Sequence, residues 1–179
     1  MRQWSMTMRL NGKTALVTGA GGGLGGAIAK RFAAEGASVL CTDRDLARAD
    51  AAVAAILESG GTASALTVDI GEAADCEAQV AETVGRYSRI DILVNNAGVS
   101  LHRLALETSI EDWERVLRIN LTGSFLTAQA AARRMAAQGS GRIIQVGSIS
   151  GQRGNMGGAD FKAINPMQKI PAMTDGDRV

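Results

Sequence analysis

The segment Thr18-Gly19-Ala20-Gly21-Gly22-Gly23-Leu24-Gly25 joins a β-branched apolar run at 13–18 to an Ala-rich stretch at 24–35. Glycines at a strand-to-helix turn allow a tight bend, let a pyrophosphate approach the backbone and let the helix pack closely on the strand. The helix N-terminus then offers free N–H groups and the positive end of its dipole to phosphates. The segment predicts a dinucleotide-binding α/β unit. Taken alone, it is equally consistent with a flexible glycine turn.

An acidic residue follows the next apolar run, at 38–42. Asp43 lies at about the 20-residue offset at which an acid hydrogen-bonds the adenosine ribose hydroxyls of a dinucleotide. Its charge would also repel a 2′-phosphate, so the position predicts NAD rather than NADP. Arg44, the next residue, favours the phosphate instead. A carboxylate that only caps the following helix is the alternative for Asp43.

Short β-branched runs alternate with longer Ala-rich stretches along the chain. This alternation predicts βαβ units and a Rossmann-type, doubly wound parallel α/β sheet of about five strands. Strands are expected at 13–18, 38–42, 62–68, 91–94 and 142–146, and helices at 24–35, 46–58, 72–87 and 111–137.

The last of these helices is expected to begin at a capping box. Thr108 and Glu111 have the S/T-x-x-E spacing of that motif. Four apolar residues follow at helical spacing and are expected to face the core: Trp113, Val116, Leu117 and Leu121.

The chain divides into three parts by residue type. Residues 1–10 are expected to be a flexible leader, residues 11–158 the dinucleotide-binding domain, and residues 159–179 an irregular tail. The tail contains both prolines of the chain, and Asn165-Pro166 disfavours a helix there. The leader lacks the apolar stretch of a signal peptide.

Composition favours an ordinary globular protein. Of 179 residues, 46% are apolar and 21% are charged. The net charge is +1 and the basic residues are scattered along the chain, which argues against nucleic-acid binding. No apolar run is long enough to span a membrane. Cys41 and Cys76 are expected to be buried free thiols in a reducing compartment, so a cytoplasmic location is expected.

Five motifs, in order, resemble the short-chain dehydrogenase/reductase family from about Gly12 to Gly158. They are Thr18-Gly19-x-x-x-Gly23-x-Gly25, Val68-Asp69-Ile70, Asn95-Asn96-Ala97-Gly98, Arg118-Ile119-Asn120-Leu121-Thr122-Gly123 and Gly141-Arg142-Ile143-Ile144-Gln145-Val146-Gly147-Ser148. The resemblance implies NAD-dependent oxidation or reduction of a small alcohol or ketone. It implies Ser148 as a catalytic residue and Asn120 as the support of a proton relay. The implied cofactor-binding residues are Thr18, Gly19, Gly22, Gly23, Leu24, Gly25, Asp43, Arg44, Asp69, Ile70, Asn96, Ala97 and Gly98. No metal is implied.

The resemblance breaks off at the acid/base residues. The family places a Tyr thirteen residues after the serine and a Lys four residues further, and this chain has Phe161 and Asn165 there. A phenol needs a nearby cation to exchange protons near neutral pH, and Phe has no proton to exchange. Lys162, Lys169 and Tyr87 are not expected to substitute for them.

The resemblance also implies a truncated domain. The family's last strands would be missing, and the strand at 142–146 is expected to be an exposed edge. Three outcomes stay open: slow turnover through positioning alone, NAD binding or a partner interaction without turnover, and a fragment that folds poorly. A contact with a second copy through the helix near Glu111 is a further expectation.

Overall fold

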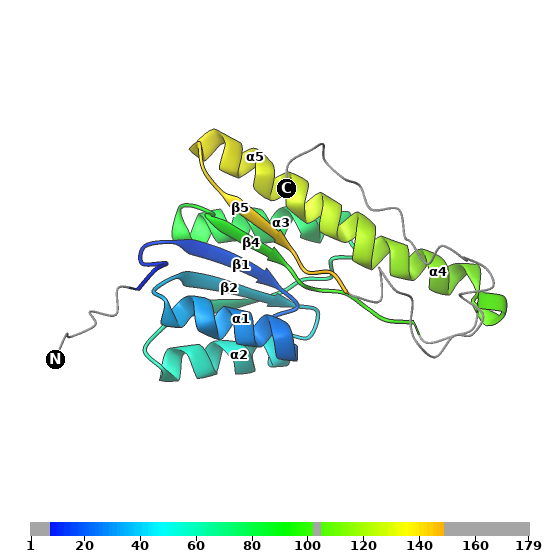
Figure 1. The fold of residues 1–179 in the computed structure, drawn as a ribbon, viewed down its shortest axis with the longest axis horizontal. Helices are drawn as coiled ribbons and strands as arrows, with labels where there is room; N and C mark the ends of the chain where they lie inside the picture. Colours follow the sequence, from blue (N-terminus) through cyan, green and yellow to red (C-terminus); the bar gives the residue numbers. More distant parts are fainter. Residues whose placement is uncertain (1–7, 102–104, 149–179) are drawn as a thin grey trace.

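The computed structural model describes residues 8–101 and 105–148. Within these residues, five parallel strands form one sheet in the order β3-β2-β1-β4-β5 (Figure 1). The strands are β1 (Thr14–Thr18), β2 (Ser38–Asp43), β3 (Thr62–Thr67), β4 (Ile92–Asn95) and β5 (Arg142–Gln145). The helices are α1 (Gly23–Ala34), α2 (Leu46–Glu58), α3 (Ala73–Tyr87), α4 (Ile110–Leu117) and α5 (Ser124–Gln138). The predicted Rossmann-type sheet is confirmed.

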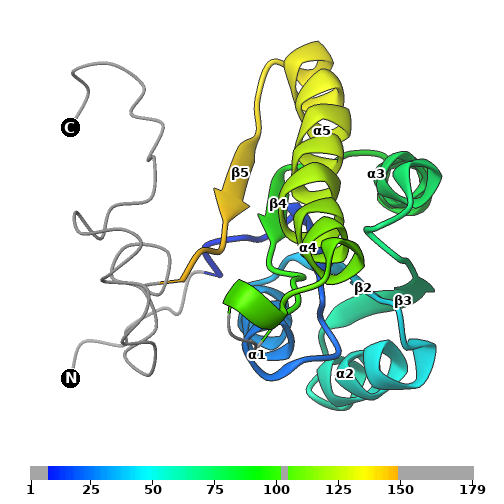
Figure 2. The same ribbon diagram turned by 90° about the vertical axis from the view of Figure 1, so that its right-hand side faces the viewer.

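Helices cover both faces of the sheet, with α1 and α2 packed on one face and α3 and α5 on the other (Figures 1 and 2). The side chains of β1 alternate between the two layers because successive residues of a strand point to opposite faces. Ala15 and Val17 belong to the hydrophobic core between the sheet and helices α1 and α2. Leu16 belongs to the hydrophobic core on the other face, between the sheet and helices α3 and α5. Ala15, Leu16 and Val17 are all fully buried, because helices cover both faces of the sheet at β1.

The order of the strands determines where a ligand can bind. From β1 the chain moves outward in one direction to β2 and β3, and then returns to place β4 on the other side of β1. The loops after β1 and β4 therefore diverge at a topological switch point, and open α/β sheets bind ligands in the crevice at this point.

The predicted long helix is wrong in its detail. Its N-cap is Ser109, whose hydroxyl accepts a hydrogen bond from the Asp112 N–H at 3.1 Å, so the helix does not begin at the Thr108 capping box. Its middle, Arg118–Gly123, is π-helical and separates α4 from α5. A pattern of apolar residues at helical spacing does not distinguish an α-helix from one with a π-helical turn.

The expected burial of the α4 residues is wrong as well. Trp113 is 55% exposed and Leu121 63% exposed, Leu117 is exposed, and Val116 is only half-buried. Spacing identifies an apolar face but not what covers it, and no described element covers this one. The expected contact with a second copy through this helix stays a prediction.

Two smaller expectations are confirmed. Cys41 in β2 and Cys76 in α3 are buried free thiols. Strand β5 lies at an edge of the described sheet, beside β4 only, and all four of its residues are exposed.

No helix of the described residues is both long and apolar enough to cross a membrane. The boundaries of the three predicted parts of the chain stay predictions, and residues 149–179 and most of the leader lie outside the described residues.

Candidate functional site

A cavity of about 310 Å³ opens at the carboxyl ends of β1, β2 and β4. The glycine loop forms one wall, and the segments after β2, β3 and β4 form the others. The lining residues are Gly19, Gly22, Gly23, Leu24, Gly25, Thr42, Asp43, Arg44, Arg48, Val68, Asp69, Ile70, Asn96, Ala97, Gly98, Val99 and Ile119. Four separate motifs of the sequence thus meet around one space.

The glycine loop needs glycine at particular positions. Gly19 has a φ of +64°, in the left-handed region. A Cβ at Gly25 would lie 2.3 Å from the Gly19 carbonyl oxygen, whereas a Cβ at Gly23 would meet nothing within 4 Å. Gly25 is therefore required for the tight turn and the close helix, while Gly23 leaves open space over the helix N-terminus. Such a bare backbone with free N–H groups suits a phosphate.

Thr18 joins the ends of β1 and β4 beneath the loop. Its hydroxyl accepts hydrogen bonds from the N–H groups of Asn96 and Ala97, both at 3.0 Å, and donates to the Val94 carbonyl at 3.4 Å. The Asn96 amide donates in return to the Thr18 and Gly19 carbonyls, at 3.0 and 3.3 Å. Thr18 is 1% exposed and does not line the cavity, so its contribution is to hold the two loops together.

Asp43 lies at the wall of the cavity, against the glycine loop. Its carboxylate accepts hydrogen bonds from the N–H groups of Gly21 and Asp45, both at 3.1 Å. The N-cap of α2 is Asp45, whose side chain accepts from the Ala47 and Arg48 amides. Asp43 is therefore not the N-cap of α2, and the alternative that it only caps this helix is wrong.

Asp69 and Ile70 form the wall after β3. The Asp69 carboxylate accepts a 2.8 Å hydrogen bond from the Gly71 N–H, and the Asp69 N–H donates to Asp75 at 2.9 Å. Ile70 is buried, and its carbonyl oxygen would lie 2.0 Å from a Cβ at Gly123. The absence of a side chain at Gly123 lets the π-helical segment pack directly on this wall.

Asn120 lies in the π-helical segment and is exposed. Its side chain bonds to both backbone groups of Val99, accepting from the N–H and donating to the carbonyl oxygen, each at 2.8 Å. Single π-helical turns occur frequently at functional sites. Asn120 is not among the cavity-lining residues, although its neighbours Val99 and Ile119 are.

Ser148 is the last described residue and follows β5. It is exposed and does not line the cavity. The chain before it is held to β4 by a 2.9 Å hydrogen bond from the Val146 N–H to the Asn95 carbonyl. Phe161 and Asn165, and with them Lys162 and Lys169, lie outside the described residues.

Tyr87, as expected, is not near this space. Its hydroxyl bonds to the Ser64 hydroxyl at 2.8 Å and donates to the Val39 carbonyl at 3.4 Å, on the α3 side of the sheet.

Some cavity residues were not predicted from the sequence. Thr42, Arg48, Val68, Val99 and Ile119 line the cavity but were not predicted as site residues. Arg48 lies only five positions after Asp43, in the first turn of the next helix. Proximity to the predicted acid was the available signal. Among residues 8–101 and 105–148, no group of His, Cys, Asp and Glu is placed to hold a metal ion.

Comparison with known proteins identifies the family. Residues 13–163 match the family model described as short chain dehydrogenase. The chain is 41% identical over 155 residues to a 3-oxoacyl-[acyl-carrier-protein] reductase of Synechocystis sp., covering 86% of this chain and 63% of the relative. It is 41% identical over 140 residues to a D-threitol dehydrogenase of Mycolicibacterium smegmatis, covering 78% and 54%. The chain thus spans little more than half of each relative.

Solved structures agree with this assignment. A short-chain type dehydrogenase/reductase from Mycobacterium marinum superposes with a TM-score of 0.81 at 36% identity, covering 84% of this chain and 61% of that one. A hydroxysteroid dehydrogenase from Escherichia coli gives a TM-score of 0.75 at 35% identity, with 80% and 59% covered. The sheet, the glycine loop and these likenesses together show that the chain belongs to the short-chain dehydrogenase family, whose members are oxidoreductases that use nicotinamide cofactors.

Proposed function

We propose that the chain binds NAD in the cavity at the carboxyl ends of the strands. The observation that carries the proposal is the position of Asp43, whose carboxylate faces the cavity while the Gly21 N–H holds it against the glycine loop. A carboxylate there is suited to accept hydrogen bonds from ribose hydroxyls. The open space above Gly23, at the start of α1, suits the pyrophosphate.

The remaining cavity residues fit the rest of a dinucleotide. Asp69 and Ile70 form the wall on the adenine side, as the resemblance implies, and Asn96, Ala97 and Gly98 line the far side of the loop. Thr18 and Asn96 fix the spacing of these walls through their hydrogen bonds. The cavity is therefore organised before any ligand enters, which lowers the entropic cost of binding.

The chemistry that we propose for this site is hydride transfer between an alcohol and a ketone. The nicotinamide supplies the redox step when it is bound, and the protein orients the reactants. Ser148 would donate a hydrogen bond to the substrate oxygen, and Asn120 would position the loop that contains Val99 beside the nicotinamide end of the cavity. The names of the two curated relatives, a reductase and a dehydrogenase, are consistent with this class of reaction.

A second candidate is NAD binding without turnover. Phe161 and Asn165 stand where the family has its acid/base Tyr and the Lys that lowers the pKa of that Tyr. Loss of a general acid/base costs about 10² to 10⁴ in rate. This candidate keeps the cavity intact and removes only the chemistry.

The two candidates are separated by measuring binding and turnover on the same protein. NADH binding is followed by the fluorescence of the dinucleotide, with Asp43→Ala as the site variant. NADH formation from NAD is then followed with a panel of secondary alcohols, for the wild type and for a Phe161→Tyr/Asn165→Lys double variant. Binding that Asp43→Ala weakens supports the site, and absence of binding by the wild type contradicts it.

The turnover measurement then distinguishes an active oxidoreductase from a chain that binds NAD without turnover. Turnover by the wild type supports an active oxidoreductase. Binding without turnover supports the inactive module, and turnover that appears only in the double variant would show that the two replacements removed the activity.

A further inference from the structure

A buried amide of α3 lies behind the end of β2. The Thr42 hydroxyl donates a 3.0 Å hydrogen bond to the side-chain carbonyl of Gln79, and the Gln79 amide donates one of 3.0 Å to the Thr127 hydroxyl. These three residues, the amide network, are each at most 1% exposed. Thr42 is one of the residues that line the cavity, whereas Gln79 and Thr127 are not. The amide network therefore reaches the cavity from behind, through a single residue of the sheet.

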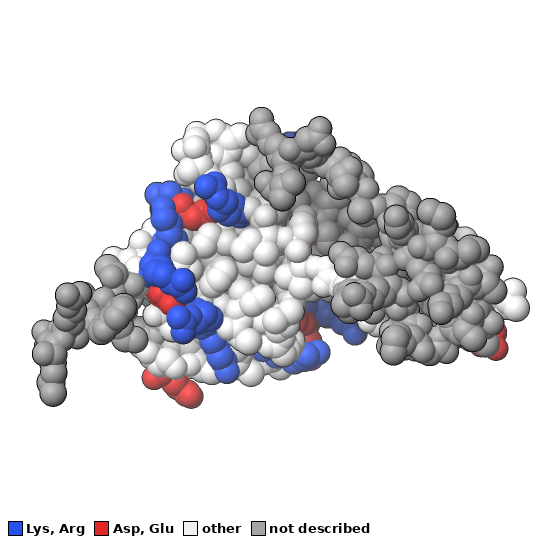
Figure 3. Space-filling view, viewed as in Figure 1, with Lys and Arg blue, Asp and Glu red and all other residues white. Residues whose placement is uncertain are grey.

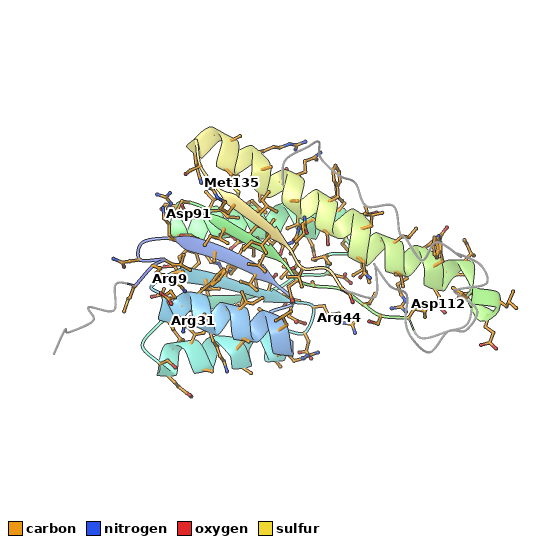
Figure 4. All side chains as sticks on the ribbon, viewed as in Figure 1. Arg9, Arg31, Arg44, Asp91, Asp112 and Met135 are labelled. Carbon is orange, nitrogen blue, oxygen red and sulfur yellow. The ribbon has the colours of Figure 1, made fainter. Side chains whose placement is uncertain are left out.

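The amide network lies at the cavity end of the sheet. Figure 4 shows Arg44, two residues after Thr42, beyond the carboxyl ends of the strands, and Asp91 toward the opposite end. At that opposite end the sheet is held by charged groups, because Arg89 binds Asp91 through two hydrogen bonds and Lys13 lies 3.6 Å from the same carboxylate. In Figure 3, Lys and Arg lie beside Asp and Glu along the left-hand edge, where β1 begins. The amide network, by contrast, joins neutral side chains at the end of the sheet that holds the cavity.

Thr42 is bonded to the glycine loop and directly precedes Asp43. Its carbonyl oxygen accepts a 2.9 Å hydrogen bond from the Ala20 N–H. The Asp43 carbonyl oxygen accepts one of 3.0 Å from the Val68 N–H. Successive side chains of a strand point to opposite faces, so the Thr42 hydroxyl turns toward α3 while the Asp43 carboxylate turns toward the Gly21 N–H. A displacement of Thr42 would therefore move Asp43 relative to the glycine loop.

The same helix also holds the next wall of the cavity. Cys76 lies one turn before Gln79 in α3 and is fully buried. Its thiol donates a 3.3 Å hydrogen bond to the carbonyl oxygen of Ile70, which lines the cavity after β3. Helix α3 is thus bonded to the end of β2 and to the segment after β3, the two parts of the chain that form the adenosine side of the proposed site.

We propose that Gln79 is a positioning residue for dinucleotide binding: through Thr42 it holds the end of β2, so that the Asp43 carboxylate is in place for the ribose hydroxyls. An amide suits this role because it accepts from one hydroxyl and donates to another. A buried polar network in which every group is paired makes the residues that it joins more rigid. The inference rests on the proposed binding of NAD and adds to that site a residue that does not line the cavity.

The test measures the dissociation constant of NADH by the fluorescence of the dinucleotide, at a temperature at which the thermal unfolding curve shows each variant to be folded. Gln79→Met replaces both polar atoms by an apolar side chain of similar length and so leaves little empty space. It is expected to weaken NADH binding about fivefold, less than the loss of a hydrogen bond to a charged group, because Asp43 is displaced rather than removed. An amide that only stabilised the fold would leave the NADH affinity of the folded protein unchanged.

Further variants separate positioning from a general loosening of the fold. Thr42→Val breaks the same link from the strand and is expected to weaken binding similarly, whereas Thr42→Ser keeps the hydroxyl and is expected to lose less affinity. Thr83→Val is the matched control, because Thr83 is fully buried in the same helix and its hydroxyl donates to the Gln79 backbone carbonyl. This control is expected to bind NADH as the wild type does. In an Asp43→Ala background, Gln79→Met is expected to cause no further loss, since two changes that act through one group are not additive.

The contrary results are distinct from one another. A folded Gln79→Met protein that binds NADH as tightly as the wild type overturns the inference and leaves the proposed function standing. An equal loss in Thr83→Val, or a full further loss in the Asp43→Ala background, also overturns the inference, because the amide would then act on the fold as a whole. If Gln79→Met does not unfold cooperatively, the comparison of Thr42→Val with Thr42→Ser decides the same question. A wild type that does not bind NADH overturns both the inference and the proposed function.

Discussion

The side chain of Asn120 pairs with the backbone of Val99 through two hydrogen bonds of 2.8 Å, one accepted and one donated. Val99 lies in the loop after β4 and lines the cavity, while Asn120 lies 21 residues further along, in the π-helical segment. An amide is suited to this pairing because it offers a donor and an acceptor side by side. The pair ties the wall of the cavity to the helix layer.

Replacing Asn120 tests this tie. Asn120→Ala removes both hydrogen bonds, and because the site is exposed, the free energy of unfolding is expected to fall by only about 1 kcal/mol. NADH binding is expected to weaken as well, since the loop with Val99 loses its anchor. Urea unfolding and fluorescence titration measure the two effects. Asn11→Ala is the control, because the exposed Asn11 side chain makes no hydrogen bond among the described residues. A variant indistinguishable from that control would contradict the role of Asn120.

Replacement by alanine is expected to lower the stability of the protein at one glycine of this loop and to leave it nearly unchanged at another. At Gly25 the new Cβ would lie 2.3 Å from the Gly19 carbonyl oxygen and 2.6 Å from the Asn96 amide nitrogen. Gly25→Ala is expected to cost about 1–3 kcal/mol of stability, as overpacking does. Gly23→Ala meets nothing within 4 Å, so its stability should stay within about 0.5 kcal/mol of the wild type. Thermal unfolding of the two variants compares them, and equal destabilisation would refute the geometry of the loop.

A buried amide links three elements in the layer of α3 and α5. Gln79 of α3 accepts a 3.0 Å hydrogen bond from Thr42 of β2 and donates one of 3.0 Å to Thr127 of α5. All three residues are at most 1% exposed. Gln79→Ala would leave two hydroxyls without this partner and open a cavity, at a cost of about 3 kcal/mol.

Urea unfolding measures that cost, with Gln129→Ala as the comparison. Gln129 is exposed on α5, where it bonds Arg133, and its replacement is expected to change stability by no more than about 0.5 kcal/mol. A change in Gln79→Ala as small as this would show that the buried network does not stabilise the fold.

The two thiols are expected to be unreactive in the native protein. Burial raises the pKa of Cys41 from 9.0 to about 12, and burial also raises the pKa of Cys76. Since the thiolate is the reactive form, alkylation by iodoacetamide at pH 8 should be slow until urea unfolds the chain. Rapid labelling of the native protein, located by mass spectrometry, would contradict this expectation.

The same shift makes stability depend on pH. Because the pKa of Cys41 is higher in the folded chain than in the unfolded chain, its contribution to the free energy of unfolding is complete below pH 9 and is lost as the pH rises toward 12.

Local patterns were sufficient to predict the sheet and most of the residues that line the cavity. The apolar runs and the Ala-rich stretches between them predicted the ends of every strand and of α1, α2 and α3 to within one residue, because strand and helix periodicities are local properties of a chain. The division of the last predicted helix into α4 and α5 was not predicted. Twelve of the predicted cofactor-binding residues line the cavity. They belong to loops at the carboxyl ends of parallel strands, and the topology of such a sheet brings these loops together.

Other features depend on neighbours that the pattern does not specify. The apolar spacing at Trp113 and Leu121 predicted a buried face, and the structure leaves it exposed because no described element packs there. In the π-helical segment Arg118–Gly123, Gly123 packs closely on the Ile70 carbonyl, a contact with a distant part of the chain that the local pattern does not specify. The Thr108 capping box was wrong because the adjacent Ser109 is the residue that caps the helix.

The sequence by itself determined the fold class, the glycine loop and the acid at Asp43, since these depend on residue type and spacing along a single strand–turn–helix unit. The tertiary structure alone decided that Arg48 lies beside the glycine loop and that Asn120 holds Val99. Both relationships join segments whose relative placement is set by packing helices against a sheet, and that packing is a property of the whole chain rather than of any local stretch.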